Sequence, residues 1–276
     1  MLTFIMLHQE FEPSDILKDA IKCFWYNVRA ADESQPDFEV LPDGYTEIIF
    51  HFGILSFKSS DGFEPLPSPF MIGLLNKPAV FQTESQLQII GIRCFPWSVF
   101  DLLELPSSKG GIRIIKHPIA KLQPALEKQI LEGRVDEAIS LVKSYFVEAR
   151  SRLSMDSMLF KAGLAMLKAN GTIPVSEVAS AAHATVRTLE RKFKQSSGHS
   201  VKDISAVMRF EQVRNQLWLC PETSIAGLAE ELGYTDQSHL SKEFKRYSGT
   251  TPGAFARKAR QQKQIVKNDF VAFVQD

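Results

Sequence analysis

Two short runs in the second half of the chain bring together side chains of the types that bind base edges and phosphates. In each run, a leucine and a phenylalanine four residues apart fit a helix face that is turned inward. They are Leu189 and Phe193 in the first run, and Leu240 and Phe244 in the second. The positions left facing outward are Arg187, Glu190, Arg191 and Lys194, then Gln237, Ser238, Ser241, Lys242 and Lys245. Arg, Lys, Gln and Ser read base edges and bind phosphates, and a helix fits the major groove, so both runs are predicted recognition helices.

Each predicted recognition helix follows a shorter helix and a turn, and the two copies match. The first helices have apolar residues at i, i+3, i+4 and i+7. These are Val175, Val178, Ala179 and Ala182, then Ile225, Leu228, Ala229 and Leu232. A capping residue, Thr185 or Asp236, opens each second helix. A glycine, Gly198 or Gly249, closes it. Matched residues of the two copies are 50 positions apart before the turn and 51 positions apart after it. This is expected of two copies of one helix–turn–helix unit whose turns differ by one residue.

Residues 200–219, between the two units, are predicted to form one continuous helix. Ser200 can cap it, and its buried stripe is Ala206, Phe210, Val213 and Leu217. Trp218 is predicted to fill the junction between the units. Such a helix would fix the separation of two recognition helices, so that one molecule enters two successive major grooves about 10 base pairs apart.

The chain has 276 residues, enough for two domains, and its halves differ in charge. Residues 155–276 hold 17 Lys and Arg against 12 Asp and Glu, whereas residues 1–154 hold 15 against 20. The basic half is therefore expected to meet a polyanion. Three widely separated cysteines indicate neither a disulfide framework nor a zinc cluster. With no signal-peptide pattern and no apolar run of about 18 residues, we expect a cytoplasmic protein without a membrane partner.

The first hundred residues have the pattern of β-structure. Runs rich in β-branched and aromatic residues alternate with turn signals such as Pro42-Asp43-Gly44. The predicted strands are 21–28, 45–52, 69–75 and 87–95, followed by a helix at 97–105 and an extended piece at 110–117. The predicted fold is α+β with two domains. An antiparallel β sandwich or cupin-like barrel with flanking helices precedes an all-α tandem helix–turn–helix half.

Residues 122–154 are predicted to be a helical linker between these domains. An apolar stripe of Val135, Ile139, Val142 and Phe146 runs along it. Packing against its own domain and a dimer seam both explain such a stripe. The predicted division is a β-rich regulatory domain at 1–121, the linker, a DNA-binding domain at 155–261 and a tail at 262–276, with the main boundary near Ser154.

The second half resembles the AraC family of bacterial transcription regulators. The likeness is carried by VASAAHATVRTLERKFKQSSGHSV (178–201) and LAEELGYTDQSHLSKEFKRYSGTTPGAF (228–255). It implies a sequence-specific transcription factor whose two helix–turn–helix units bind double-stranded DNA. It also implies base-facing roles for Arg187, Glu190, Arg191, Gln237, Ser238, Ser241 and Lys242. Phosphate contacts are predicted at the helix starts and flanking basic positions, namely Thr185, Lys194, His239 and Lys245. RNA polymerase is a further candidate partner, and the alternatives of monomer and homodimer stay open.

The first unit departs from the family pattern at two positions. His183 stands where the turn usually has glycine, and a positive φ there costs a non-glycine residue about 1 kcal/mol. Glu190 places an acid on the recognition face, where it could accept from a cytosine or weaken docking.

The first half resembles a β-rich domain of unknown function found ahead of such DNA-binding halves. FWYNV (24–28), VLPDGYTEIIFHFG (40–53) and IIGIRCFP (89–96) carry this likeness. By analogy with family members whose cupin-like domain binds an effector, a small-molecule effector is predicted. Its candidate pocket is Phe24, Trp25, Tyr26, Phe50 and Phe52, for which core packing is the alternative.

No dinucleotide-binding, Walker, zinc-protease or serine-hydrolase motif occurs in the sequence, so no enzyme activity and no cofactor are predicted. The alternative of a cupin-type metal-dependent enzyme rests on Glu47 and His51, which point the same way from one strand, and we assign no metal site to them. A second alternative is a partner-binding protein with vestigial DNA-binding units.

Overall fold

The computed structural model describes residues 7–29, 36–105, 111–151 and 158–265. The strands are β1 (Leu7–Phe11), β2 (Ile21–Arg29), β3 (Asp37–Val40), β4 (Thr46–Phe52), β5 (Ser56–Lys58), β6 (Phe63–Pro65), β7 (Phe70–Ile72), β8 (Ala79–Gln82), β9 (Leu87–Cys94) and β10 (Ile112–Ile114). The helices are α1 (Val99–Leu103), the 3₁₀ helix η1 (Pro118–Leu122), α2 (Gln123–Leu131), α3 (Val135–Ser151), α4 (Met158–Lys168), α5 (Val175–Ala181), α6 (Val186–Ser197), α7 (Val201–Leu219), α8 (Ile225–Glu231), α9 (Gln237–Ser248) and α10 (Pro252–Ile265).

The strands form two antiparallel sheets, as the sequence predicted. One sheet has the order β1-β2-β9-β4-β7-β10 and the other β3-β8-β5-β6. Alternation along β4 places Ile48 and Phe50 in the cluster that reaches the helices. It places Ile49 in a second cluster with Phe70 and Phe81, which joins the two sheets. Both faces of the central strands are therefore buried.

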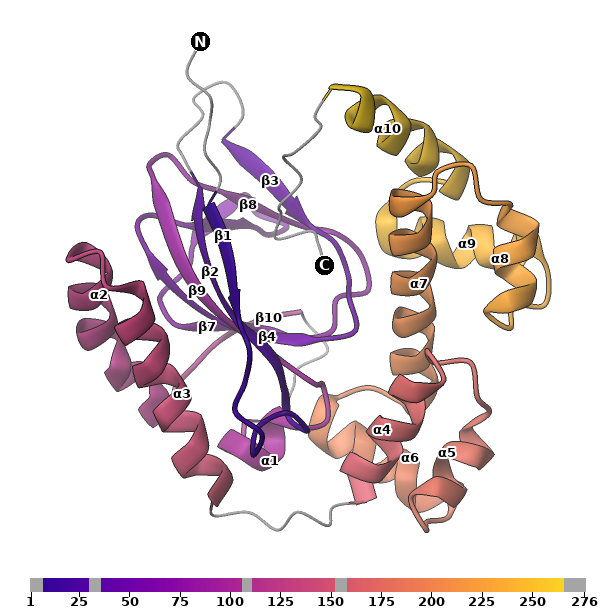
Figure 1. The fold of residues 1–276 in the computed structure, drawn as a ribbon, viewed down its shortest axis with the longest axis horizontal. Coiled ribbons are helices and arrows are strands. Elements are labelled where there is room, and N and C mark those ends of the chain that lie inside the picture. Colours follow the sequence, from indigo (N-terminus) through magenta and orange to yellow (C-terminus); the bar gives the residue numbers. More distant parts are fainter. Residues whose placement is uncertain (1–6, 30–35, 106–110, 152–157, 266–276) are drawn as a thin grey trace.

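Helices α2 and α3 cover the outer face of the larger sheet (Figure 1). The predicted helical stretch is broken in two, because Gly133 has a left-handed backbone with φ 72°. On α3, Ile139, Val142 and Phe146 are fully or almost fully buried in the cluster they share with the sheet. The stripe thus packs against its own domain, the first of the two alternatives.

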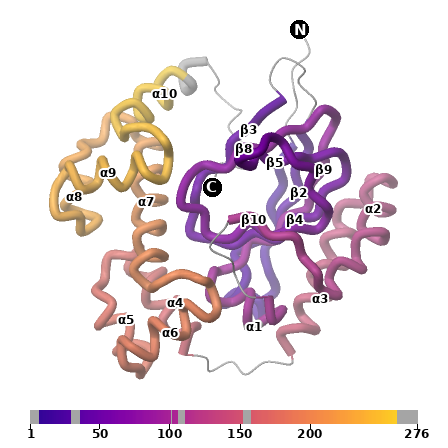
Figure 2. Tube along the Cα trace, turned by 180° about the vertical axis from the view of Figure 1, so that it is seen from behind, coloured from indigo at the N-terminus to yellow at the C-terminus, as the bar shows by residue number. Residues whose placement is uncertain are grey.

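From residue 158 to residue 265, the helices α4 to α10 and their connections make up the C-terminal half, as predicted (Figure 2). The long helix α7 stands beside the sheets, with α4, α5 and α6 at one end and α8, α9 and α10 at the other (Figure 1). The predicted boundary near Ser154 and the last eleven residues of the predicted tail lie outside the described residues. None of the described helices combines the length and apolar content that crossing a bilayer requires.

The two halves share one hydrophobic core at the first unit. Phe95 and Trp97 belong to the same buried cluster as Phe193 of α6. The rings of Phe95 and Trp97 are stacked, with their centroids 5.3 Å apart. The ring centroids of Trp97 and Phe193 are 6.3 Å apart. Gly163 of α4 lies against the Trp97 ring, which leaves no room for a side chain there. This contact fixes the first unit on the sheet domain.

Candidate nucleic-acid interface

Both recognition helices begin and end as their sequences predict. The Thr185 hydroxyl accepts from the Thr188 N–H at the start of α6, and the Asp236 carboxylate accepts from the His239 N–H at the start of α9. Gly198 and Gly249 end the two helices in the left-handed conformation, with φ 76° and 73°. The two units are therefore equivalent in local structure.

The faces of these helices are divided between core and solvent as expected. Leu189, Phe193, Leu240 and Phe244 are at most 1% exposed. Most of the predicted DNA-contacting residues are exposed: Thr185, Arg187, Arg191, Lys194, Gln237, Ser238, His239, Lys242 and Lys245. Ser241 is half-buried. Each helix therefore presents one polar and basic face, and the roles of its individual residues stay predictions.

Glu190 differs from the other predicted base-facing residues. Its side chain is half-buried, and its carboxylate accepts from the Val201 N–H at 3.4 Å. Val201 is the first residue of α7, so Glu190 lies at the junction of α6 with the connecting helix. This contact supports a structural role and explains why an acid is tolerated beside a DNA-binding face.

The two turns have the same backbone conformation although their residues differ. His183 has φ 52° in the first unit, and Gly233 has φ 68° in the second. The histidine therefore occupies the left-handed region that the family pattern fills with glycine, as the sequence suggested. In the second unit, Tyr234 is buried and its ring meets His239 edge-on, with centroids 5.3 Å apart.

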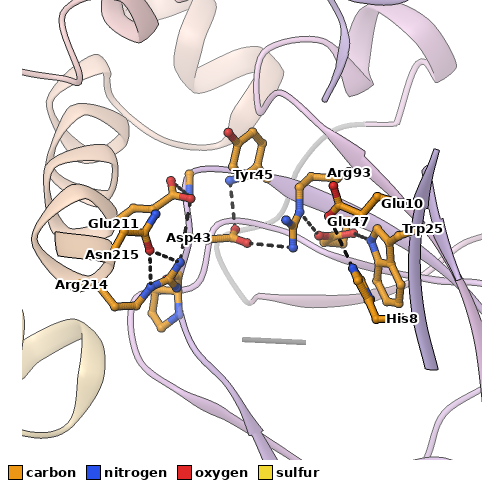
Figure 3. Close-up of polar contacts among 12 residues, drawn as sticks. His8, Glu10, Trp25, Asp43, Tyr45, Glu47, Arg93, Glu211, Arg214 and Asn215 are labelled. Atoms are coloured by element: carbon orange, nitrogen blue, oxygen red, sulfur yellow. Dashed lines mark hydrogen bonds and ion pairs between the residues drawn. The ribbon is translucent and has the colours of Figure 1, made fainter. Parts of the chain in front are cut away.

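Figure 3 shows a polar cluster that runs from the sheet interior to the connecting helix. Arg93 Nε donates to Glu47 Oε1 at 2.7 Å, and Trp25 Nε1 donates to Glu47 Oε2 at 2.9 Å. A second guanidinium nitrogen of Arg93 lies 3.8 Å from Asp43 Oδ2. Because these groups come from β2, β4, β9 and the loop before β4, their meeting could not be read from the sequence.

The loop that carries Asp43 also contacts α7. The Gly44 N–H donates to Glu211 Oε2 at 3.3 Å, and Arg214 Nη1 donates to the Pro42 carbonyl at 3.3 Å (Figure 3). Burial raises the pKa of Glu211, and Asp43 raises it further while Arg214 opposes the shift. Burial likewise raises the pKa of Asp43, against the effect of Arg93. On the α7 side, this interdomain contact is thus made by two buried charged groups, Glu211 and Arg214.

The five aromatic residues of the candidate effector pocket do not line one cavity. Phe24, Tyr26 and Phe50 are buried in the cluster under α3, and Phe52 packs against it. Trp25 points to the opposite face of the sheet, because neighbouring strand residues alternate. Beside Trp25 is a cavity of about 20 Å³, the space of a single water. The five residues therefore do not form one pocket in this structure, and each of them lies in or against a packed core cluster.

A larger opening lies between the smaller sheet and the second unit. This cleft has a volume of about 940 Å³, and its lining includes Phe38, Trp218, Phe255, Arg29, Lys58 and Lys258. Trp218 therefore faces the sheet domain across a cleft, instead of filling the junction between the two units. The sheet domain shares a buried core with the first unit, whereas it borders the second unit mainly across this cleft, with Pro78 near Gly249.

Glu47 and His51 do not converge on a shared site. The Glu47 carboxylate is bonded to Arg93 and Trp25, whereas the His51 ring nitrogens lie 3.0 Å and 3.1 Å from the carbonyls of Gly53 and Leu66. Burial lowers the pKa of His51. In the part of the chain that the structure describes, no group of three or more His, Cys, Asp or Glu could hold a metal ion.

Comparison with known families supports a division of the chain into two parts. Residues 178–258 match a family described as a helix-turn-helix domain, and residues 9–110 match a domain of unknown function, DUF6597. The transcriptional regulatory protein YesN of Bacillus subtilis, itself described as uncharacterized, is 34% identical over 71 residues, or 25% of this chain. The match spans only 19% of the length of YesN.

Two solved structures are similar at low identity. ToxT of Vibrio cholerae is 13% identical, with 85% of this chain and 97% of that chain covered and a TM-score of 0.45. An AraC-type regulator of Chromobacterium violaceum is 22% identical, with 38% and 93% covered and a TM-score of 0.35. Within this chain, residues 178–258 are thus similar to a family of helix-turn-helix domains, and residues 9–110 are similar to a family of domains whose function is unknown.

Proposed function

We propose that the protein is a sequence-specific DNA-binding transcription regulator that reads two adjacent major grooves with α6 and α9. The observation that carries this proposal is the repetition of one helix–turn–helix unit with an exposed polar and basic face in both copies. Base-edge contacts are assigned to those faces, and phosphate contacts to their basic flanks and helix starts.

The separation of the two units supports reading by a single molecule. Helix α7 has 19 residues and spans about 28 Å at about 1.5 Å per residue. One turn of DNA is about 34–36 Å long, so units held at its two ends are suitably spaced for successive grooves. RNA polymerase as a partner, a monomeric or dimeric state and a cytoplasmic location stay predictions.

The alternatives receive less support from the described residues. A metal-dependent enzyme needs converging ligands, and Glu47 and His51 are each bonded to other groups. Vestigial DNA-binding units would be expected to lose their exposed basic positions, whereas Lys242 and Lys245 are exposed on α9.

We further infer that the sheet domain controls DNA binding through the contact of Pro42 and Gly44 with α7. A small-molecule effector has room in the cleft beside the second unit, and the cavity next to Trp25 has room for water only. Arg214→Met removes the bond to Pro42 without touching either recognition helix. It is expected to change affinity for the cognate duplex about fivefold or more with base preference intact. Unchanged affinity would contradict this control.

The proposed function is tested by selecting bound sequences from a random duplex library with the full-length protein. Two conserved blocks about 10 base pairs apart are the expected result. Affinity for the selected duplex should fall steeply with salt, because phosphate contacts release counterions. A single block would limit base reading to one unit, and no enrichment would refute the proposal.

A further inference from the structure

Although most of each unit lies at its own end of α7, one loop of the first unit and one turn of the second approach each other beside the middle of that helix. In the first unit, the loop between α4 and α5 packs closely on α7. A Cβ at Gly171, which has φ 72°, would lie 2.5 Å from the Ser205 carbonyl oxygen. In the second unit, the turn between α8 and α9 comes close to the same loop, since a Cβ on Gly233 would lie 3.9 Å from Thr172 Cβ. The two units therefore come close to each other at this junction, in addition to the buried cluster that they share with α7.

One side chain, Arg209 of α7, contacts both sides of the junction. Its Nη1 donates to the Gly171 carbonyl of the first unit at 3.0 Å. Its Nη2 lies 3.7 Å from Glu243 Oε1, on recognition helix α9 of the second unit. Its guanidinium carbon also lies 5.2 Å from the ring centre of Tyr234, in the turn before α9. Arg209 and Glu243 are mostly buried, with side chains 15% and 12% exposed.

The chemistry of arginine suits this position. A planar guanidinium presents several donors in fixed directions and stacks on an aromatic face, so it can hold a carbonyl, a carboxylate and a ring at once. Tyr234 is 7% exposed, and burial together with the Glu243 carboxylate raises the pKa of its phenol, which keeps the ring neutral beside the arginine. Glu243 is bracketed by Lys242 and Phe244, so fixing it also fixes the outward and inward faces of α9.

We propose that Arg209 is a positioning residue that sets the separation and orientation of the two recognition helices, and so allows both to bind DNA together. This rests on the proposed function. Replacing Arg209 leaves in place the apolar residues that pack both units against α7 and the exposed face of each recognition helix. What is lost is the simultaneous binding of both units to one duplex. Once one unit is bound, the other binds favourably only if it is already held at the right distance and orientation.

The test compares affinity for a duplex with both selected blocks and a duplex with one block scrambled. Wild-type protein should favour the two-block duplex strongly. The two-block advantage is the ratio of the affinities for the two-block and the one-block duplex. Arg209→Met should reduce this ratio about tenfold or more, while the affinity for one-block duplexes changes little. Arg209→Lys keeps the charge but cannot hold all three partners, and an intermediate advantage is expected.

The matched control is Arg260→Met. Arg260 also bonds a carbonyl and a glutamate, Pro221 and Glu222, but both lie in one segment next to the second unit. Its replacement should leave the two-block advantage unchanged. If Arg209→Met fails to fold, Glu243→Gln removes the ion pair with almost no change of shape and should reduce the advantage in the same direction.

A measurement without DNA separates this inference from the proposed function. Nitroxide labels at Gln195 of α6 and Arg246 of α9, both exposed, report the distance between the recognition helices in a Cys220→Ser background. Arg209→Met should broaden a narrow distance distribution. If wild-type protein shows no two-block advantage, reading of two grooves fails and the distance distribution alone decides the role of Arg209. A distribution as narrow as that of the wild type, in a folded variant, would overturn the inference.

Discussion

Replacement of Gly163 by alanine tests the contact between the sheet domain and the first unit. A Cβ at this position would lie 2.0 Å from Cε2 and 2.2 Å from Cζ2 of Trp97. Carbon atoms in contact are normally about 3.5–4.0 Å apart, so either the indole or α4 must move. The indole has little space, because Trp97 is 2% exposed and stacked on Phe95.

Two opposing effects decide the magnitude. In a helix interior, alanine is better than glycine by about 1 kcal/mol. Overpacking a filled core costs about 1–3 kcal/mol, and a displaced Trp97 that exposes about 60 Å² loses roughly 1.5 kcal/mol more at about 25 cal/mol per Å². The clash outweighs the helix preference. We expect Gly163→Ala to lower the free energy of unfolding by about 1.5–3.5 kcal/mol.

Urea unfolding followed by circular dichroism and tryptophan fluorescence measures this change. The control is Gly227→Ala in α8, where the nearest atom to a new Cβ is 3.6 Å away, an ordinary contact. That variant should be stabilised by about 0.5–1 kcal/mol. Equal stabilisation of both glycine variants would refute the reasoning, since it would mean that Trp97 moves aside freely.

Three further predictions concern the turns, the recognition helix and the interdomain contact. His183→Gly should raise the free energy of unfolding, measured in urea, by about 1 kcal/mol, and Gly233→His should lower it by at least as much. Effects of the opposite sign would exclude backbone strain at these turns. Lys242→Ala or Gln237→Ala should cost about 1–3 kcal/mol at the selected duplex and relax base preference, and unaltered selection by both variants would remove α9 from base reading. Because burial raises the pKa of Glu211, the folded state binds its proton more tightly, so this stabilisation is present at low pH and is lost as pH rises through the folded pKa. Glu211→Gln should therefore reduce the fall in the free energy of unfolding above about pH 4.5, as measured by urea titrations at a series of pH values. An equal fall in the variant and the wild type would contradict the raised pKa of Glu211.

The C-terminal half could be predicted closely because its signals are local. Capping residues such as Thr185 and Asp236 satisfy helix N-termini within three positions, and helical spacing assigns Leu189 and Phe193 to the core without knowledge of any other segment. The left-handed backbone at His183 was suggested by the family pattern, which usually has glycine at that position of the turn. The predictions of caps and of the core face each used only residues within about four helical turns of one another in the sequence.

The contacts between distant segments could not be predicted in this way. Strand alternation shows that Phe24 and Trp25 face opposite sides, but the sequence does not tell which side is a cavity and which is core. The partners of Arg93 come from other strands and a loop, and Glu190 turns toward α7 because the chain returns there. Contacts between residues so far apart in the sequence produce no repeating pattern of residue types, so a single sequence does not reveal them.

The core shared by Phe95, Trp97 and the first unit has a consequence for building chimaeras of this protein. A cut between α3 and α4 looks like a natural place to exchange sensory domains, yet it would leave the Gly163 face of α4 without the ring that covers it. A transplanted sheet domain therefore needs a flat aromatic side chain at the position of Trp97. The second unit shares no such buried ring with the sheet domain, so the outward residues of α9 can be exchanged for a different sequence preference as long as the end of the helix near Pro78 is kept.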